Sequence, residues 1–395
     1  MTTVLHIVPE LKPGGVEFYT LRMVDAITRA GARPLVASGP GALLADLNAL
    51  GGEHIPFDAA AKNWFAWPAR ARALAKLIDR ERVDLVHVGS RVPGWLAVLA
   101  RRHRPFPLVM NYHGAYSEGF PGKRAYNAVM TKGDVCLASS RFTVEHVRAR
   151  HPIDPAKLKR IWLGIDPTTF DPACINAKRA NAVRAAWGVT ADQRIILSAG
   201  RLVSLKGHDV VIAAADKIFA EHADAVIVIA GDDLGRADYR RRLDELIAQT
   251  TDPSRIRLVG NCTDMPAAFA VAHASVIGSV RPETFSYVAI ESQAMGCPVI
   301  SADAGAVSDT LATDDDAGRT GWLYPPGDAS AMADRINAAL RLTLQERDAI
   351  AERCRARVLD HFTLARMQRE TLAEYDRLLG TGLAAAFNPD GTHHG

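Results

Sequence analysis

The chain has 395 residues, of which 48% are hydrophobic, 23% charged and 7% aromatic, and this ordinary composition excludes disordered, collagen-like and coiled-coil proteins. One hydrophobic core seldom serves a chain of this length, so we expect two domains. The formal net charge is +3, yet residues 1–188 carry 26 lysines and arginines against 15 acidic residues, while residues 189–395 carry 21 against 29.

The basic first half favours an anionic partner, such as a lipid headgroup of a membrane surface or a phosphorylated acceptor, although a solvated arginine-rich surface gives the same counts. Nucleic acid is disfavoured, because the basic residues are scattered and no aromatic stripe is interleaved with them.

The sequence predicts a cytoplasmic protein. No apolar run approaches the roughly 18 residues that a membrane-spanning helix needs. Residues 1–8 lack the basic start, long apolar stretch and cleavage site of a signal peptide. The five cysteines are far apart and form no CxxC, which predicts buried, reduced thiols rather than disulfides or metal ligands.

In the first half, short apolar segments alternate with patterns of helical spacing, and Pro9–Gly15 forms a turn-rich loop after the first strand. Strands are predicted at Thr3–Val8, Pro34–Ser38, Leu85–Val88, Leu108–Tyr112 and Val135–Ala138. Helices are predicted at Glu17–Ala30, Ala42–Leu50, Leu96–Arg102 and Arg141–Arg150.

Residues 151–188 contain four prolines and a helix that ends near Gly188, which predicts a boundary between domains 1–188 and 189–360. The second domain repeats the alternation. Its strands are predicted at Ile195–Ala199, Ala225–Ala230, Ile256–Val259, Ser275–Gly278 and Val299–Ser301. Its helices are predicted at Asp209–His222, Tyr239–Gln249, Met265–His273 and Phe285–Met295.

A last helical stretch runs from about Ala329 to Leu379. A break near His361 predicts that residues 361–380 return to the first domain, and residues 381–395 are expected to fray. Alternating strands and helices predict an α/β protein with two Rossmann-like, doubly wound parallel sheets. Ligands of such sheets bind outside the carboxyl ends of the strands, so facing ends would place the active site in a central cleft.

Two carboxylates stand eight residues apart in the segment 281–300, which reads RPETFSYVAIESQAMGCPVI. Glu283 lies in the loop before a predicted helix, where it can accept hydrogen bonds from sugar hydroxyls. Glu291 lies two turns further on, where it can reach a ribose diol. A capping glutamate and a solvated glutamate are the structural alternative for this pair.

Two cations follow the first strand of the second domain. Arg201 and Lys206, five positions apart on a tight loop, can straddle a diphosphate, although exposed basic pairs are common. Gly14 and Gly15, between the first strand and helix, allow close approach of the backbone to a ligand. His113 ends a strand before Gly114 and should point into the cleft, unless it is a structural histidine.

The sequence resembles the retaining nucleotide-sugar glycosyltransferases of family 4, which have the GT-B fold. The hallmark is a glutamate, seven residues and a second glutamate running into A-x-G-x-P-V-I, matched from Glu283 to Ile300. Further matches are Asn111–Gly114, Leu163–Asp166, Ala199–Leu202 with Lys206–Gly207, Ala230–Asp232, Gly260 and Thr320–Asp328. The resemblance covers nearly the whole chain, and the G-G-V-E of Gly14–Glu17 looks like the subgroup of lipopolysaccharide assembly.

The resemblance implies transfer of a sugar from a nucleoside-diphosphate donor to a hydroxyl of a glycan or glycolipid, with retention and without a metal ion or other cofactor. Its implied catalytic residues are Glu283, His113, Arg201 and Lys206. Its implied donor contacts are Gly14, Gly15, Arg201, Lys206, Gly260, Glu283, Phe285, Ser286 and Glu291. Lipid phosphates would be met by Arg101–Arg104 and Lys123–Arg124, at the inner face of the cytoplasmic membrane.

Two other patterns resemble known binding motifs but are not interpreted as binding sites. Gly39-Pro40-Gly41 lacks the third glycine and acidic residue of a dinucleotide fingerprint. Asp314–Asp316 is a D-x-D-like run in a polar turn, which we read as solvated rather than metal-binding.

The chain also departs from the family. Ser286 replaces a glycine, and the later G-G-x-x-E pattern reads Ala304-Gly-Ala-Val-Ser-Asp309. The alternatives are therefore an epimerase or sugar phosphorylase of the same fold, and a catalytically silent protein that binds sugar nucleotides.

Overall fold

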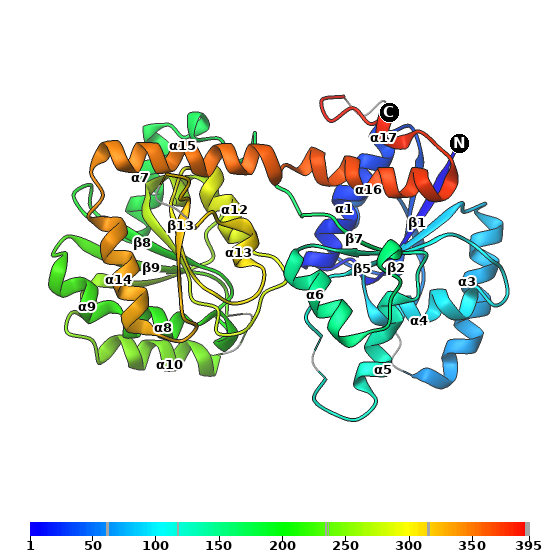
Figure 1. The fold of residues 1–395 in the computed structure, drawn as a ribbon, viewed down its shortest axis with the longest axis horizontal. Helices are drawn as coiled ribbons and strands as arrows, with labels where there is room; N and C mark the ends of the chain where they lie inside the picture. The colour runs from blue at the N-terminus through cyan, green and yellow to red at the C-terminus, as the bar shows by residue number, and fades with distance from the viewer. Residues whose placement is uncertain (61–62, 117, 234, 236, 314–316, 392–395) are drawn as a thin grey trace. The chain divides into compact units, whose positions relative to one another are not determined.

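The computed structural model describes residues 1–60, 63–116, 118–233, 235, 237–313 and 317–391. The chain forms two compact units (Figure 1). Unit 1 comprises Met1–Leu163 and Leu364–Gly395, and unit 2 comprises Gly164–Thr363.

Unit 1 contains a seven-stranded sheet in the order β3-β2-β1-β4-β5-β6-β7, and every neighbouring pair is parallel. The strands are β1 (Thr3–Glu10), β2 (Arg33–Gly39), β3 (Glu53–Pro56), β4 (Leu85–Val88), β5 (Leu108–Tyr112), β6 (Val135–Ala138) and β7 (Leu158–Arg160). Alternate residues of β1 supply cores on both faces, with Leu5 and Ile7 in one and Val4 in the other.

Helices cover both faces of this sheet. Helices α3 and α4 supply the core that contains Leu5, while α1 and α16 supply the core that contains Val4. The helices of unit 1 are α1 (Gly15–Arg29), α2 (Leu44–Ala49), α3 (Trp67–Arg80), α4 (Arg91–Ala100), α5 (Lys123–Asn127), α6 (Arg141–Arg150), α16 (Leu364–Leu379) and α17 (Leu383–Ala386).

Unit 2 contains a six-stranded parallel sheet in the order β10-β9-β8-β11-β12-β13. The strands are β8 (Arg194–Ala199), β9 (Ala225–Ala230), β10 (Ile256–Gly260), β11 (Ala272–Ile277), β12 (Val299–Ala302) and β13 (Gly321–Tyr324). The strand order reverses between β8 and β11, which is the point at which sheets of this kind bind ligands. The two sheets confirm the predicted α/β class.

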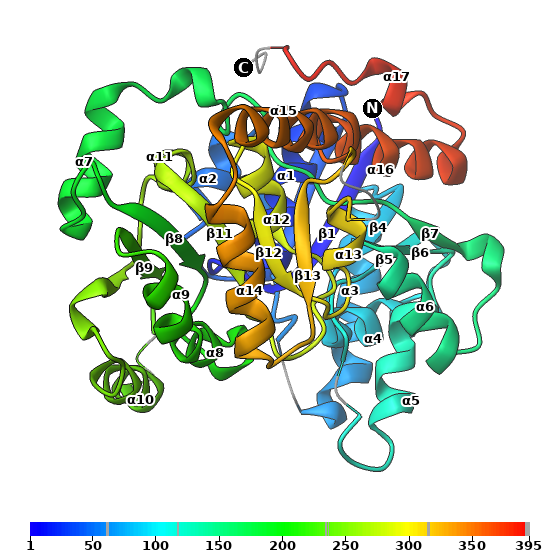
Figure 2. The ribbon, with the colours of Figure 1, turned by 60° about the vertical axis from the view of Figure 1, so that its left-hand side comes forward.

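The sheet of unit 2 is also covered on both faces. Helix α14 crosses one face together with α8 and α9 (Figure 2), and α7 and α11 pack on the other. The helices are α7 (Ala177–Trp187), α8 (His208–Ala213), α9 (Ala215–Glu221), α10 (Ala237–Ala248), α11 (Met265–Val271), α12 (Tyr287–Ala294), α13 (Val307–Thr310), α14 (Ala329–Leu340) and α15 (Leu344–His361). The single helix predicted at Asp209–His222 is thus two helices that meet at Ala214.

The division between the units falls after Leu163 rather than at residue 188. The reason lies in α7, which was expected to close the first domain but packs against α11 of unit 2. Val183 and Trp187 share a core with Phe269, and Arg179 forms a 2.7 Å ion pair with Asp264.

The C-terminal segment is packed against unit 1 through Gly391 instead of fraying. Leu383 and Phe387 are buried in the core beside α1, and Arg29 donates a 2.8 Å hydrogen bond to the carbonyl oxygen of Pro389. Sequence reading misses this packing because the segment is short and small residues dominate it.

The five cysteines are free thiols, but they are not all buried as expected. Cys136, Cys297 and Cys354 are buried, Cys262 is partly buried and Cys174 is exposed. Across the residues that the structure describes, no helix is long and apolar enough to cross a bilayer.

Two histidines lie in the interior of unit 1 and are bridged by a tyrosine from α16. The Tyr375 hydroxyl lies 2.5 Å from Nδ1 of His87 and 3.3 Å from Nε2 of His6. Burial lowers the pKa of His6 from 6.5 to about 3 and the pKa of His87 well below 6.5, so both rings are neutral at pH 7.

These histidines predict a loss of stability in mild acid. Below pH 6.5 the unfolded chain binds protons that the folded chain excludes, so the free energy of unfolding should fall by up to about 1.4 kcal/mol per pH unit for each histidine. Urea unfolding between pH 7.5 and 5 measures this slope. The slope should be smaller in His6→Gln than in the control His103→Gln, whose side chain is exposed. Equal slopes in the two variants would contradict the assignment.

Candidate active site

Two loops of unit 2 meet where its strand order reverses. One loop follows β8 and ends at Gly207, and the other follows β11 and begins at Gly278. Gly207 has a φ of +64°, and a Cβ there would collide with the carbonyl oxygen of Gly278. The two backbones touch here because neither position carries a side chain.

An ion pair joins these loops. Nζ of Lys206 lies 2.7 Å from Oε1 of Glu283, and the side chains are only 21% and 12% exposed. The hydroxyl of Ser279 also donates to Oε1 of Glu283. The structure therefore brings together two of the predicted site residues and adds Ser279, which the sequence analysis missed because a serine in this loop has no distinguishing pattern.

The backbone of Glu283 is held by the loop 304–306. Its N–H donates to the carbonyl oxygen of Ala304 over 3.2 Å, and its carbonyl oxygen accepts the N–H of Ala306 over 2.8 Å. Gly305 has a φ of +83°, and a Cβ there would lie 2.7 Å from the nitrogen of Glu283 and still closer to its carbonyl oxygen. The one glycine of the family pattern that this chain keeps in the loop thus fixes Glu283.

Arg201 is exposed on the β8 loop, and a buried histidine supports its backbone. Nε2 of His208 lies 3.2 Å from the carbonyl oxygen of Arg201, so Nε2 carries the hydrogen and Nδ1 accepts from the Ser198 hydroxyl 3.0 Å away. Burial lowers the pKa of His208, which keeps the ring neutral. Sequence reading missed His208, although it directly follows Lys206-Gly207.

Gly260 ends β10, which lies two strands out from β8 in the sheet. Its carbonyl oxygen accepts a 2.7 Å hydrogen bond from the N–H of Gly231, at the end of β9. Gly260 therefore lies at the same carboxyl edge of the sheet as the loops described above.

The start of α12 carries the remaining residues of the donor prediction. Ser286 is the N-cap and is 2% exposed, with a φ of −118° that does not require glycine. The Phe285 ring packs edge-on against Tyr287 and against the buried Phe362, with centroids 5.6 and 6.1 Å apart. Glu291 is partly buried and lies one turn into the helix, not two, because α12 begins at Tyr287.

Gly14, Gly15 and His113 belong to unit 1. Gly14 is the extended N-cap of α1 and Gly15 is its first residue, and a Cβ on Gly14 would collide with the carboxylate of Glu17. The His113 ring follows β5 and meets Tyr19 edge-on at 5.1 Å. Burial lowers its pKa to about 4, so it is a neutral imidazole at pH 7.

The described residues contain no group of three or more histidine, cysteine, aspartate or glutamate side chains placed to hold a metal ion. Asp314–Asp316 lies outside the described residues.

Two protein-family models match this chain, one over most of the first part of unit 1 and one over most of unit 2. The family model "Glycosyltransferase Family 4" matches residues 13–169, and the model "Glycosyl transferases group 1" matches residues 180–357. A curated relative, the D-inositol 3-phosphate glycosyltransferase of Mycobacterium tuberculosis, is 27% identical over 95% of this chain and 82% of its own.

Solved structures agree in fold. A glycosyltransferase from Rickettsia africae is 30% identical, with a TM-score of 0.88 over 96% of this chain and 99% of its own. The Anabaena protein HepE, solved with UDP-glucose, is 21% identical, with a TM-score of 0.81 over 96% of this chain and all of its own. WaaG, a glycosyltransferase involved in lipopolysaccharide biosynthesis, is 15% identical, with a TM-score of 0.70 over 96% and 100%.

The close contact between Gly305 and the backbone of Glu283, here called the clamp, predicts the effect of Gly305→Ala. The positive φ costs about 1–2 kcal/mol for a residue with a Cβ, and the collision with Glu283 adds about 1–3 kcal/mol. Gly327→Ala is the matched control, because Gly327 has a φ of +81° and open space around it. Urea unfolding should show that Gly305→Ala is destabilised by more than Gly327→Ala, because only Gly305→Ala adds the collision to the cost of the positive φ. Turnover should fall in Gly305→Ala and not in Gly327→Ala. Equal losses in the two variants would contradict the clamp.

Proposed function

Because the chain belongs to the group 1 glycosyltransferases of family 4, which are retaining and use nucleotide sugars, we propose that Lys206, Glu283 and Arg201 form its donor site. The main support for this proposal is the ion pair between Lys206 and Glu283, which lies where the strand order of the unit 2 sheet reverses. The ion pair places the Lys206 ammonium beside the loops that meet at Gly207 and Gly278. A diphosphate can approach the backbone of such glycine-containing loops closely.

In this proposal the Lys206 ammonium is oriented by Glu283 rather than neutralised by it. An ammonium has three N–H groups, and one of them serves Oε1 of Glu283. The others are directed by that contact toward the donor pyrophosphate, together with the exposed Arg201. Both cations then stabilise the negative charge that grows on the leaving nucleoside diphosphate.

Glu283 suits the binding of hydroxyls better than nucleophilic attack. Its Oε1 accepts from Lys206 and Ser279, which stabilises the carboxylate as an acceptor and lowers its nucleophilicity. We therefore propose front-face transfer: the bond from the anomeric carbon to phosphate breaks, the acceptor oxygen bonds to the same face, and the leaving phosphate takes the hydroxyl proton. Glu291 holds the ribose, and Gly260, Phe285 and Ser286 line the donor site.

We propose unit 1 as the acceptor side, where Gly14, Gly15 and the neutral His113 contribute. A UDP-sugar is the first donor to test, because the similar HepE was solved with UDP-glucose. The acceptor is proposed to be a glycan or glycolipid of the cell envelope, for which WaaG is the precedent.

Lys206→Ala should lower turnover about 100- to 1,000-fold, the range found when one donor of a charge-stabilising site is removed. Lys217→Ala is the matched control, because Lys217 also forms an ion pair in unit 2, with Asp334 at 2.5 Å. Release of nucleoside diphosphate from a panel of nucleotide sugars, with and without acceptor, measures the effect. Wild-type rates in Lys206→Ala would overturn the donor site.

The same panel separates the alternatives. Diphosphate release that needs an acceptor supports transfer. A changed sugar without an acceptor would indicate epimerisation, and binding without turnover would indicate a silent sensor.

We also propose that unit 1 docks on an anionic membrane, and the structure shifts which residues support this. Two arginines of the predicted run are engaged internally, Arg101 with Asp134 and Arg104 with Asp79. The exposed Phe120 lies beside Lys123 instead, with the ammonium 4.9 Å from the ring centroid. A basic side chain next to an exposed aromatic ring suits the membrane interface.

Co-sedimentation with lipid vesicles tests the docking. One preparation contains neutral lipid only, and the other also contains about 30% anionic lipid, on the order of the anionic content of a cytoplasmic leaflet. Binding should need the anionic lipid and fall about tenfold in Lys123→Glu, while Lys217→Glu in unit 2 stays bound. Binding that is indifferent to anionic lipid would contradict this proposal.

A further inference from the structure

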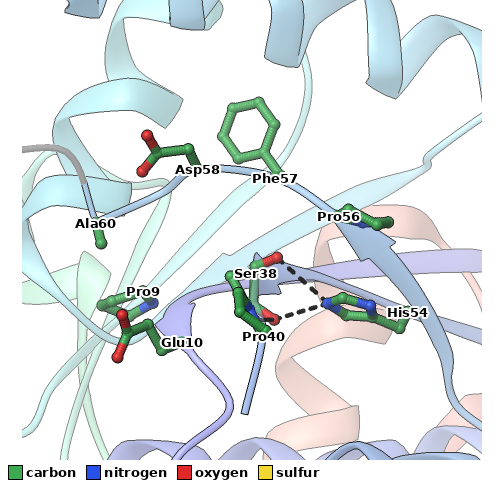
Figure 3. Close-up of a pocket in the computed structure, with 10 residues that line it drawn as sticks. Pro9, Glu10, Ser38, Pro40, His54, Pro56, Phe57, Asp58 and Ala60 are labelled. Atoms are coloured by element: carbon green, nitrogen blue, oxygen red, sulfur yellow. Dashed lines mark hydrogen bonds between the residues drawn. The ribbon is translucent and has the colours of Figure 1, made fainter.

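A pocket of about 510 Å³ opens in unit 1 at the carboxyl ends of β1, β2 and β3 (Figure 3). Its volume lies within the range of small-molecule sites. Glu10 and Asp58 lie toward one end and His54 lies at the other, while Phe57 also lines the pocket and packs against the core of unit 1.

The Gly39-Pro40-Gly41 motif builds one wall of this pocket. A Cβ on Gly41 would collide with the carbonyl group of Leu11, and a Cβ on Gly39 would lie 3.2 Å from the carbonyl oxygen of Pro9. The chain after β2 therefore lies directly on the chain after β1. The two glycines serve this contact, which explains the motif without a dinucleotide.

The polar groups of the pocket are pre-oriented. Glu10 pairs with Lys12 at 2.6 Å, and Asp58 pairs with Arg70 at 2.5 Å. Each ion pair occupies part of a carboxylate that has about four lone-pair sites, so both carboxylates keep the capacity to accept further hydrogen bonds.

His54 is fixed in the same way at the opposite end. Its Nε2 lies 3.2 Å from the carbonyl oxygen of Ser38 and 3.0 Å from the Ser38 hydroxyl, whose own hydrogen is donated to the carbonyl oxygen of Gly39. Nε2 must therefore carry a hydrogen, and the ring is held in one orientation.

The lining selects a chemical class. Two carboxylates accept hydrogen bonds from hydroxyl groups, and the apolar rings of Pro40 and Pro9 suit the C–H face of a saturated ring. A phosphate placed between Glu10 and Asp58 would have to compete with these carboxylates for the cations Lys12 and Arg70, which already pair with them.

We infer that this pocket binds an uncharged, hydroxyl-rich ring of the acceptor, a hexose or a cyclitol. The inference rests on the proposed function, in which unit 1 is the acceptor side. It places a neutral part of the acceptor at β1–β3, whereas the basic composition of this half by itself suggests only an anionic one.

Saturation-transfer NMR on the full chain, without any donor, tests the inference directly. The probes are methyl glucoside, methyl mannoside, methyl galactoside and myo-inositol, each compared with glucose 6-phosphate. At least one neutral probe should bind wild type, and its dissociation constant should rise about tenfold in Glu10→Gln/Asp58→Asn. The control variant Asp46→Asn, an exposed carboxylate on α2, should bind as wild type does.

Two results would overturn the inference: equal binding of the neutral probe to the double variant and wild type, or binding of glucose 6-phosphate alone. Circular dichroism of the double variant, whose Asp58 is exposed, establishes that it folds. Because the assay contains no donor, ring binding without acceptor-dependent diphosphate release would leave the pocket standing and refute the proposed function. Transfer activity with no neutral ring bound would do the reverse.

Discussion

The proposed donor site of unit 2 depends on the contact of two backbones, at Gly207 and Gly278. The two glycines lie in the loops that follow adjacent strands of the sheet, β8 and β11, although seventy residues separate them in the chain. Their contact sets the loops close enough for Lys206 to reach Glu283 over 2.7 Å. A larger residue at either position would push the loops apart. The short distance between Lys206 and Glu283 therefore depends on the lack of a side chain at Gly207 and Gly278.

The sequence predicts the sheets well because both are built from strands with consecutive apolar, β-branched residues. β8 and β9 are examples, since a strand buried on both faces needs no polar alternation. β3 was missed because Glu53–Pro56 is short, charged at one end and at the edge of its sheet. The boundary was misplaced because prolines and a helix end resemble a linker, whereas the packing of Trp187 decides where α7 belongs.

The candidate site shows the same contrast. Glu283 and Lys206 stand in spaced motifs and could be singled out from the chain alone. Ser279 and His208 act through contacts that only the fold creates, Ser279 on the Glu283 carboxylate and His208 on the Arg201 carbonyl group. The role of Gly39 and Gly41 was equally hidden, because it depends on which backbone lies opposite them.

The return of α16 to unit 1 has a consequence for how the chain matures on the ribosome. Unit 2 is one continuous stretch, but the interior of unit 1 is completed by residues from its far end, including Tyr375 between His6 and His87. Synthesis delivers that helix only after all of unit 2 has emerged. The nascent first unit must therefore keep an apolar face uncovered for most of translation, and a premature stop before Leu364 would leave that face open permanently.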